Sequence, residues 1–203
     1  MSPVRSAAIA VGLVLALLVG VMATRDSGPD RISAHLVGQP APPLVGTTID
    51  GEPWDLDAQR GRWVLVNFFS TTCVPCIVEH SELVAFAEAH APADDARVVS
   101  VAFDDSAEAV EQFFREQGGG WPVLAMHTGY IAVDWGGIAV PESYLVSPSG
   151  HVAAKAIGGV KAAGLEALLV EARGGACAAS RVPAGRSGHC CWSSPSPRWS
   201  WPR

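Results

Sequence analysis

The chain has 203 residues, of which 49% are hydrophobic, so it is long enough for one domain of ordinary size with a packed core and terminal extensions. Its net charge of −6 is unevenly spread, with 18 acidic and 7 basic residues between Ile32 and Arg173, then four arginines and no acid. An acidic body lacks the basic face that binding to nucleic acid requires, which argues against that class of protein and favours a solvated surface.

The first 25 residues carry a predicted export signal, either a signal anchor or a cleaved signal peptide. A single charge at Arg5 precedes an uncharged apolar run from Ala7 to Ala23. A run of this length is at the lower limit for a membrane-spanning helix and slightly long for a signal peptide. We favour a single-pass anchor in the cell membrane, with the domain on the extracytoplasmic (periplasmic) side. Residues 26–34 form a polar linker to a domain that we place at residues 35–173.

The body alternates extended and helical segments. A proline-rich extended region with a turn at Asp50-Gly51 is followed by a buried strand at 62–69 and a helix at 77–90. Further predicted elements are a strand at 96–103, a helix at 106–117, a short strand at 121–126, a hairpin of strands 142–147 and 151–159, and a helix at 161–173. Strands that alternate with helices form βαβ units, and the hairpin adds an antiparallel edge, so we expect an α/β fold with a central mixed sheet flanked by helices.

The last 30 residues, 174–203, differ in composition from the body. They are rich in Gly, Ser, Pro and Arg, contain three tryptophans and no acid, and show no periodicity. We predict a disordered tail, which also holds Cys177, Cys190 and Cys191.

The body holds two cysteines, Cys73 and Cys76, as a C-x-x-C pair just after the first buried strand. Disulfides persist outside the cytosol, and a strand that turns directly into a helix places Cys73 at the helix N-terminus, where unpaired N–H groups and the helix dipole favour a thiolate. Cys76 is expected one turn further on and more buried. Pro75 is tolerated in the first turn, where the helix needs no N–H. These features favour thiol-disulfide exchange.

Other uses of a C-x-x-C pair fit less well. Attachment of a c-type haem requires a histidine in the position of Ile77, and a zinc site requires about four ligands, of which the nearby body offers His80 as a third. A peroxidatic cysteine is expected in P-x-x-x-T/S-x-x-C, where Ser70 fits but Val66 replaces the proline. Incidental thiols are the remaining alternative. We therefore expect no metal and no organic cofactor, only a redox-active disulfide.

Four segments between about residues 38 and 172 resemble the TlpA/ResA group of membrane-anchored thioredoxin-like proteins, and most of all the cytochrome c biogenesis thiol:disulfide oxidoreductases of the CcmG/DsbE type. The segments are GQPAPPL…IDGEPWDLDAQRGRWVLVNFF, CVPCIVEHSEL, VSVAFDDSAEAVEQFF and VDWGGIAVPESYLVSPSGHV. The resemblance implies a thioredoxin-like fold with an extra N-terminal extended region and a central strand-helix insert.

The resemblance also implies roles for individual residues. A cis peptide before Pro141 would leave the backbone of Val140 free to pair with an extended substrate segment. Glu79 and Glu142 are candidates for proton relay or for tuning the thiols, against the alternative of ordinary surface carboxylates. Asn67 stands where plain thioredoxin has a buried aspartate, so a carboxylate elsewhere would have to supply that proton.

The reaction implied by the resemblance begins with attack of the Cys73 thiolate on a substrate disulfide, after which Cys76 resolves the mixed disulfide. The implied substrate is the oxidised C-x-x-C-H segment of an apocytochrome c, and a membrane electron donor of the CcdA/DsbD kind would reset the protein. The alternatives are a general extracytoplasmic exchange protein with other disulfide-bearing clients, a peroxiredoxin-like thiol peroxidase, and a non-catalytic chaperone that holds apocytochrome.

Overall fold

The fold is seen in a computed structural model, which describes residues 13–17, 20, 35–125, 128–136 and 139–179, with side chains as far as residue 175. The elements in chain order are β1 (Val45–Thr47), β2 (Pro53–Asp55), the 3-10 helix η1 (Asp57–Gln59), β3 (Trp63–Phe69), α2 (Val74–His90), β4 (Ala96–Ala102), α3 (Ala107–Gln117), β5 (Val123–Leu124), α4 (Thr128–Asp134), β6 (Glu142–Val146), β7 (Val152–Ile157) and α5 (Ala162–Ala179).

Five of the strands form one sheet in the order β5-β4-β3-β6-β7. Strand β3 pairs in parallel with β4 and antiparallel with β6, while β6 and β7 form an antiparallel hairpin. The predicted mixed sheet with an antiparallel edge is therefore confirmed. Strands β1 and β2 form a separate antiparallel hairpin around the turn predicted at Asp50-Gly51.

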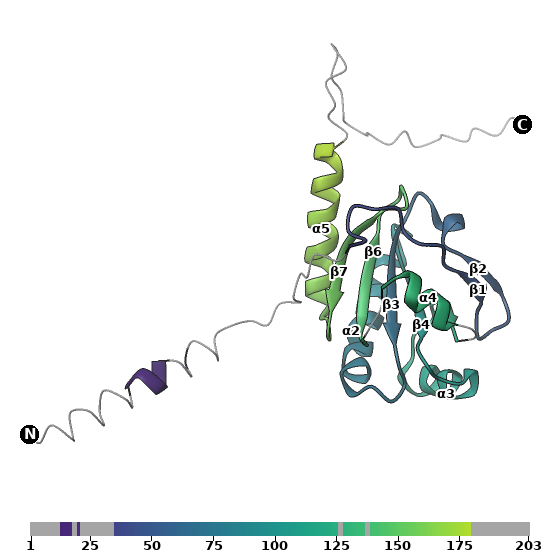
Figure 1. Cartoon of the computed structure of the whole chain (residues 1–203), viewed down its shortest axis with the longest axis horizontal. Helices are drawn as coiled ribbons and strands as arrows, with labels where there is room; N and C mark the ends of the chain where they lie inside the picture. The colour runs from purple at the N-terminus through teal and green to yellow at the C-terminus, as the bar shows by residue number, and fades with distance from the viewer. Residues whose placement is uncertain (1–12, 18–19, 21–34, 126–127, 137–138, 180–203) are drawn as a thin grey trace, which may run out of the picture.

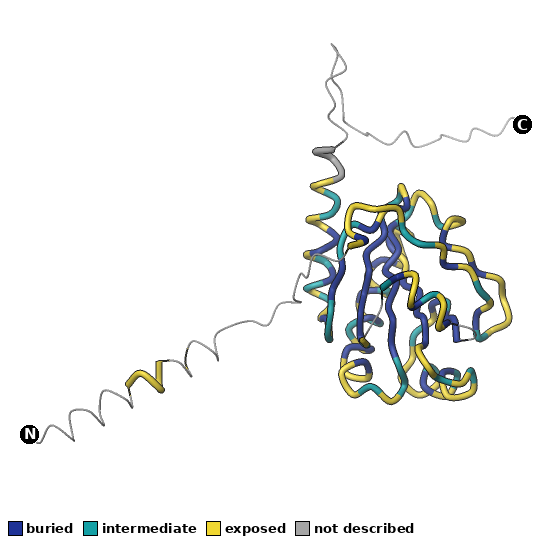
Figure 2. The backbone as a smooth tube through the Cα atoms, viewed as in Figure 1, coloured by how far each residue is buried: buried dark blue, intermediate teal, exposed yellow. Residues whose placement is uncertain are grey.

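Strand β3 is central because both of its faces are covered. Its side chains alternate between two core clusters, with Leu65 and Phe69 on one face and Val66 and Phe68 on the other. The first cluster lies under α2, α3 and α5, and the second lies under the N-terminal hairpin and α4. Figure 1 shows α4 in front of the sheet and α2 behind it, and Figure 2 shows the strands buried between these layers. All seven residues of β3 are buried, as its continuous apolar run predicts.

Three elements differ from the predicted segments. Helix α2 begins at Val74 with Cys73 as its N-cap, as predicted from the C-x-x-C pair, and so starts three residues before the periodic segment 77–90. Helix α4 was not predicted, since it has only seven residues and depends on burying Thr128 and Ala132. Helix α5 continues to Ala179, so the predicted tail boundary at residue 174 is wrong for the first six tail residues.

The predicted terminal segments fall mainly outside the described residues. Residues 13–17 and 20 of the predicted export signal are described as helical, whereas the rest of residues 1–34 and all of residues 180–203 are not described. No helix in the described part of the chain is both long and apolar enough to cross a membrane.

Candidate active site

The two cysteines of the C-x-x-C pair lie where β3 ends and α2 begins, and they are joined by a disulfide. Cys73 is the N-cap of α2, and its Sγ accepts a hydrogen bond from the backbone N–H of Cys76 at 3.3 Å. Pro75 occupies the first turn, where its missing N–H costs nothing. Cys76 is 2% exposed, whereas Cys73 is only partly buried. Cys73 is therefore the sulfur that an incoming partner can reach, and the helix N-terminus favours its thiolate.

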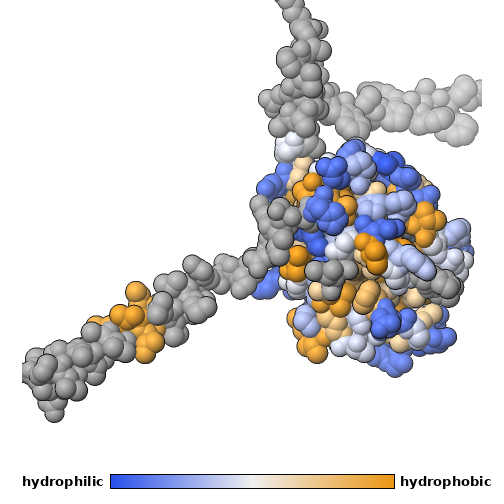
Figure 3. All heavy atoms as spheres, viewed as in Figure 1, coloured by the Kyte–Doolittle hydropathy of each residue, from blue (hydrophilic) through white to orange (hydrophobic). Residues whose placement is uncertain are grey.

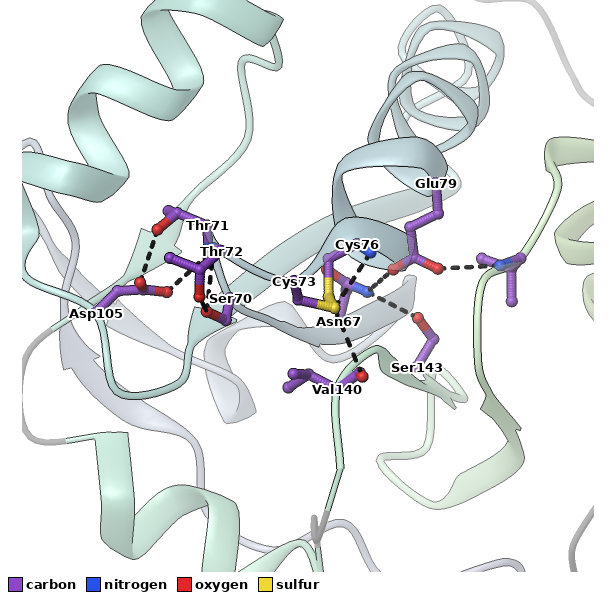
Figure 4. Close-up of a disulfide and its surroundings, with 11 residues drawn as sticks. Asn67, Ser70, Thr71, Thr72, Cys73, Cys76, Glu79, Asp105, Val140 and Ser143 are labelled. Carbon is purple, nitrogen blue, oxygen red and sulfur yellow. Dashed lines mark hydrogen bonds between the residues drawn. A yellow bond between two sulfur atoms is a disulfide. The ribbon is translucent and has the colours of Figure 1, made fainter.

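A cis peptide bond joins Val140 to Pro141, as the resemblance implies. The carbonyl oxygen of Val140 lies 3.6 Å from Sγ of Cys73, although 67 residues separate them in the chain (Figure 4). Pro141 is buried, while Val140 is partly exposed. A partly exposed backbone carbonyl beside a reachable sulfur can pair with a peptide substrate.

Glu79 lies one turn beyond Cys76 on α2 and is 2% exposed. Its Oε1 accepts a hydrogen bond from Nδ2 of Asn67 at 2.9 Å, and its Oε2 accepts one from the backbone N–H of Val160 at 3.0 Å. The same Asn67 amide donates to Oγ of Ser143 at 3.1 Å (Figure 4). Burial raises the pKa of Glu79 to about 7, and this effect outweighs that of the two hydrogen bonds, which lower the pKa. The carboxylate that Asn67 cannot provide is thus present close by.

Glu142 lies on the other face of the sheet. It pairs with Phe68 across the strands and belongs to the same face as Tyr144, whereas its neighbour Ser143 faces Asn67. Its Oε2 lies 3.0 Å from Nζ of Lys155 and accepts a hydrogen bond from the Tyr144 hydroxyl at 3.3 Å. Both members of the ion pair are buried. The two glutamates singled out from the sequence therefore have different surroundings: Glu79 is unpaired by any cation in the described structure, and Glu142 is paired.

Two further residues lie near the site: Asp105, which was not singled out from the sequence, and His80, which was considered there only as a zinc ligand. Asp105 accepts two hydrogen bonds from Thr71, one from its backbone N–H at 2.9 Å and one from its hydroxyl at 2.7 Å. His80 is buried, with Nε2 2.8 Å from the carbonyl oxygen of Gly118, and burial lowers its pKa. The only sequence signal for Asp105 was the acidic pair that ends a buried strand.

Among the described residues, no group of three or more His, Cys, Asp or Glu side chains is arranged so that it could hold a metal ion.

A cavity of about 480 Å³ lies away from the disulfide. It is lined by the C-terminal half of α2, the start of β4 and the loop before β5, and includes Val84, Ala91, Val98 and Trp121. The residues that line this cavity include neither of the two cysteines and no residue of the Val140–Pro141 segment. The disulfide is instead reachable through the partly exposed Cys73, and Val74 and Val78 of the same helix have exposed side chains. This placement suits a protein substrate better than an enclosed small molecule.

The surface as a whole is mixed in character. On the face shown in Figure 3, hydrophobic and hydrophilic residues are interspersed. The exposed apolar side chains Tyr130 and Val133 belong to α4. Those at the start of α2 belong to a different helix, more than 50 residues earlier in the chain.

A thioredoxin-like sheet, a C-x-x-C disulfide at a helix N-terminus and a cis proline against it define the class of thiol-disulfide oxidoreductases. The chain belongs to the AhpC/TSA family, whose model matches residues 37–155.

Individual relatives narrow the class. The thiol:disulfide interchange protein HelX of Rhodobacter capsulatus is 29% identical over 151 residues, which cover 72% of this chain and 83% of that protein. The DsbE homologue of Paracoccus denitrificans, also a thiol:disulfide interchange protein, is 30% identical over 154 residues, which cover 74% of this chain and 82% of that protein. These relatives confirm the resemblance to the DsbE type.

A solved structure supports the fold. The thiol:disulfide interchange protein of Chlorobium tepidum superimposes with a TM-score of 0.61 at 28% identity, covering 70% of this chain and 99% of that one. The predicted thioredoxin-like fold and thiol-disulfide oxidoreductase activity are thereby confirmed.

Proposed function

We propose that this protein reduces the C-x-x-C-H disulfide of an apocytochrome c, so that the thiols are free before haem attaches. The observation that carries the proposal is the placement of Cys73, which is partly exposed at a helix N-terminus and 3.6 Å from the Val140 carbonyl oxygen. The choice of substrate is supported by the similarity to interchange proteins of the DsbE type. We further propose that residues 1–25 tether the domain to the extracytoplasmic side of the membrane, where disulfides persist.

The reaction begins with the reduced protein. The Cys73 thiolate attacks one sulfur of the substrate disulfide, forming a mixed disulfide and releasing the other substrate sulfur as a thiolate that takes up a proton. Cys76 then loses its proton and attacks Sγ of Cys73, which expels the second substrate thiolate and leaves the Cys73–Cys76 disulfide. Two electrons pass from the protein to the substrate, and a dithiol donor in the membrane, of the CcdA/DsbD kind, returns them. No metal or organic cofactor is required for this cycle.

Glu79 is the proposed proton acceptor for Cys76. It follows Cys76 by three residues on the same helix, so both side chains lie on one face of α2. A carboxyl group with a pKa of about 7 exchanges protons readily near neutral pH. Glu142 has a structural role in this proposal, because Lys155 already neutralises it.

The substrate surface is proposed to be the first turn of α2 together with the Val140–Pro141 segment. Val74 and Val78 are each 69% exposed and Ile77 is 38% exposed, and no charged residue lies between Cys73 and Glu79. Apolar side chains around the sulfur, with backbone from Val140 for pairing, would bind an extended, uncharged peptide segment.

The test is a trap for mixed disulfides in cells that make c-type cytochromes. Replacement Cys76→Ser removes the resolving thiol, so the substrate should stay covalently bound to Cys73 and be identified by mass spectrometry. We expect apocytochromes c among the trapped proteins, and none with the control Cys73→Ser. A set of trapped proteins without any C-x-x-C-H segment would instead support a general exchange protein.

Two further alternatives have their own outcomes. If Cys73→Ala still supports normal levels of holocytochrome c, the protein is a holding chaperone and not a reductant. If the purified reduced protein consumes hydrogen peroxide much faster than it reduces protein disulfides, the peroxidase alternative is favoured.

The proposed tether is tested separately. The protein should stay with the membrane fraction during alkaline extraction and be digested by protease added to cells whose outer permeability barrier has been opened. Release of the domain by extraction would show that the signal is cleaved.

A further inference from the structure

The turn that leads into the active site is made of three hydroxyl residues, Ser70, Thr71 and Thr72. Its internal hydrogen bonds join Ser70 Oγ to Thr72 Oγ1 at 3.1 Å and the Cys73 N–H to the Ser70 carbonyl oxygen at 3.2 Å. None of the three side chains is fully buried, and Thr72 is exposed. Packing into the core therefore does not hold this turn, and its position depends on hydrogen bonds.

Asp105 supplies the bonds that tie this turn to the rest of the domain. One carboxylate oxygen accepts the Thr71 N–H at 2.9 Å and the other accepts the Thr71 hydroxyl at 2.7 Å, so both oxygens are used on one residue (Figure 4). Bonds to a charged carboxylate are shorter and stronger than neutral ones. The two residues are 34 positions apart, so the contact joins the turn to the connection between β4 and α3.

Asp105 is itself held on both sides. Before it, the N–H of Phe103 donates to the Phe69 carbonyl oxygen at 2.8 Å, which fixes the end of β4 against the end of β3. After it, Ser106 caps α3, with Oγ accepting the N–H of Ala109 at 3.2 Å. Because the backbone on both sides of Asp105 is fixed, its carboxylate can fix the position of Thr71, two residues before Cys73.

We propose that Asp105 is a positioning residue for disulfide exchange: by holding Thr71, it fixes Cys73 at the N-terminus of α2, in register with the Val140 backbone that receives the substrate. The inference rests on the proposed exchange function. It assigns the central strand-helix insert a part in the reaction, because the insert carries this carboxylate.

The experiment compares two substrates. Full-length protein with the three tail cysteines replaced by serine is reduced and mixed either with insulin, whose disulfides must dock against the protein, or with a small aromatic disulfide, which needs only an exposed thiolate. For Asp105→Ala we expect the rate with insulin to fall about tenfold and the rate with the small disulfide to change less than twofold. Asp105→Asn, which keeps one acceptor for Thr71, should recover most of the insulin rate.

A matched control is Asp104→Asn. This change removes an equal charge one residue away, at a position with φ of +59° that asparagine tolerates, and the Asp104 side chain has no hydrogen bond or ion pair with the described residues. We expect wild-type rates with both substrates. A tenfold loss of the insulin rate in Asp104→Asn, equal to that in Asp105→Ala, would show an effect of charge and overturn the proposal, as would an unchanged insulin rate in Asp105→Ala.

A second measurement does not depend on activity. Hydrogen–deuterium exchange of the segment 70–73 should be faster in Asp105→Ala than in Asp104→Asn, and equal exchange in the two variants contradicts the inference. A reduced wild-type protein that fails to reduce an oxidised C-x-x-C-H segment of an apocytochrome c would overturn the proposed function instead, and the two failures are therefore distinguishable.

Discussion

Asn67 and Glu79 form a buried pair at the site in which only the glutamate can ionise. Asn67, on β3, is neutral at every pH, but its amide donates to the carboxylate of Glu79 from α2. The residue that titrates therefore lies on the helix and not on the strand, and the strand residue binds it. The cost of this arrangement is a carboxylate in a dry environment, which the raised pKa of Glu79 reports.

The first prediction concerns stability against pH in Glu79→Gln. The native-state pKa is raised from 4.5 to about 7, so the folded wild type binds this proton more tightly than the unfolded chain does. That stabilisation is complete below about pH 4.5 and is lost as the pH rises through about 7, by about 3 kcal/mol. The glutamine variant lacks this dependence, although its one acceptor oxygen replaces the two that bind Asn67 and Val160, and this loss is the same at all pH values. Between pH 4 and pH 8, the wild type should therefore lose about 3 kcal/mol of unfolding free energy relative to Glu79→Gln.

Urea unfolding of the oxidised proteins at several pH values measures this difference. Parallel stability curves for wild type and Glu79→Gln would show that Glu79 has an ordinary pKa. The matched control is Glu82→Gln, which also removes a carboxylate of α2 that accepts a bond from the start of α5, here from the N–H of Ala162, but is not among the buried residues.

The second prediction concerns the buried ion pair of Lys155 and Glu142. Their side chains are 7% and 1% exposed, and the charged atoms lie 3.0 Å apart. Lys155→Met leaves the Glu142 carboxylate without its cation in the core, so we expect a loss of about 3–5 kcal/mol. The double variant Lys155→Met with Glu142→Leu removes both charges and should be markedly more stable than the single one. Thermal unfolding decides this, and equal stabilities of the single and double variants would contradict it.

Among the elements, those that could be predicted have strong local patterns. The buried run of β3 and the capped amphipathic pattern of α3 are readable because residues close in sequence determine them. Helix α4 is not, since its formation depends on the sheet that it covers. The short strand predicted at 121–126 is present as β5, although it spans only Val123–Leu124. The same holds for the site. The C-x-x-C pair is local, whereas the bond between Asp105 and Thr71 joins segments 34 residues apart.

The third prediction belongs to helix α3. Ser106 is its N-cap and accepts the N–H of Ala109, so Ser106→Ala should cost about 1 kcal/mol. In a domain of this size that loss corresponds to a fall in melting temperature of about 2–4 °C. Ser106→Asn supplies another capping acceptor and should stay close to the wild type. If the alanine and asparagine variants melt together, the cap contributes nothing to stability.

At the scale of the whole molecule, the domain is closed by its last helix. Leu165, Leu168 and Leu169 of α5 complete the core cluster that also contains Cys76, and Val160 at the approach to this helix binds Glu79. The C-terminal helix is thus coupled to the redox helix through both apolar and polar contacts. Its extension to Ala179 places the end of the folded domain later than composition suggests, because a helix can continue through Gly174 and Gly175 when its earlier turns are anchored.

The last prediction follows from this closure. A chain of residues 35–179 contains both core clusters and every described contact of the site, so it should fold alone, melt within about 3 °C of the full-length protein and reduce insulin at the same rate. A chain that ends at residue 163 lacks the three buried leucines of α5, each worth about 1.5–3 kcal/mol, which together approach the whole stability of an ordinary domain. We expect the shorter chain to be unfolded by circular dichroism. A folded, active 35–163 fragment would show that α5 is dispensable, and a 35–179 fragment that unfolds would show that the terminal segments contribute to the core.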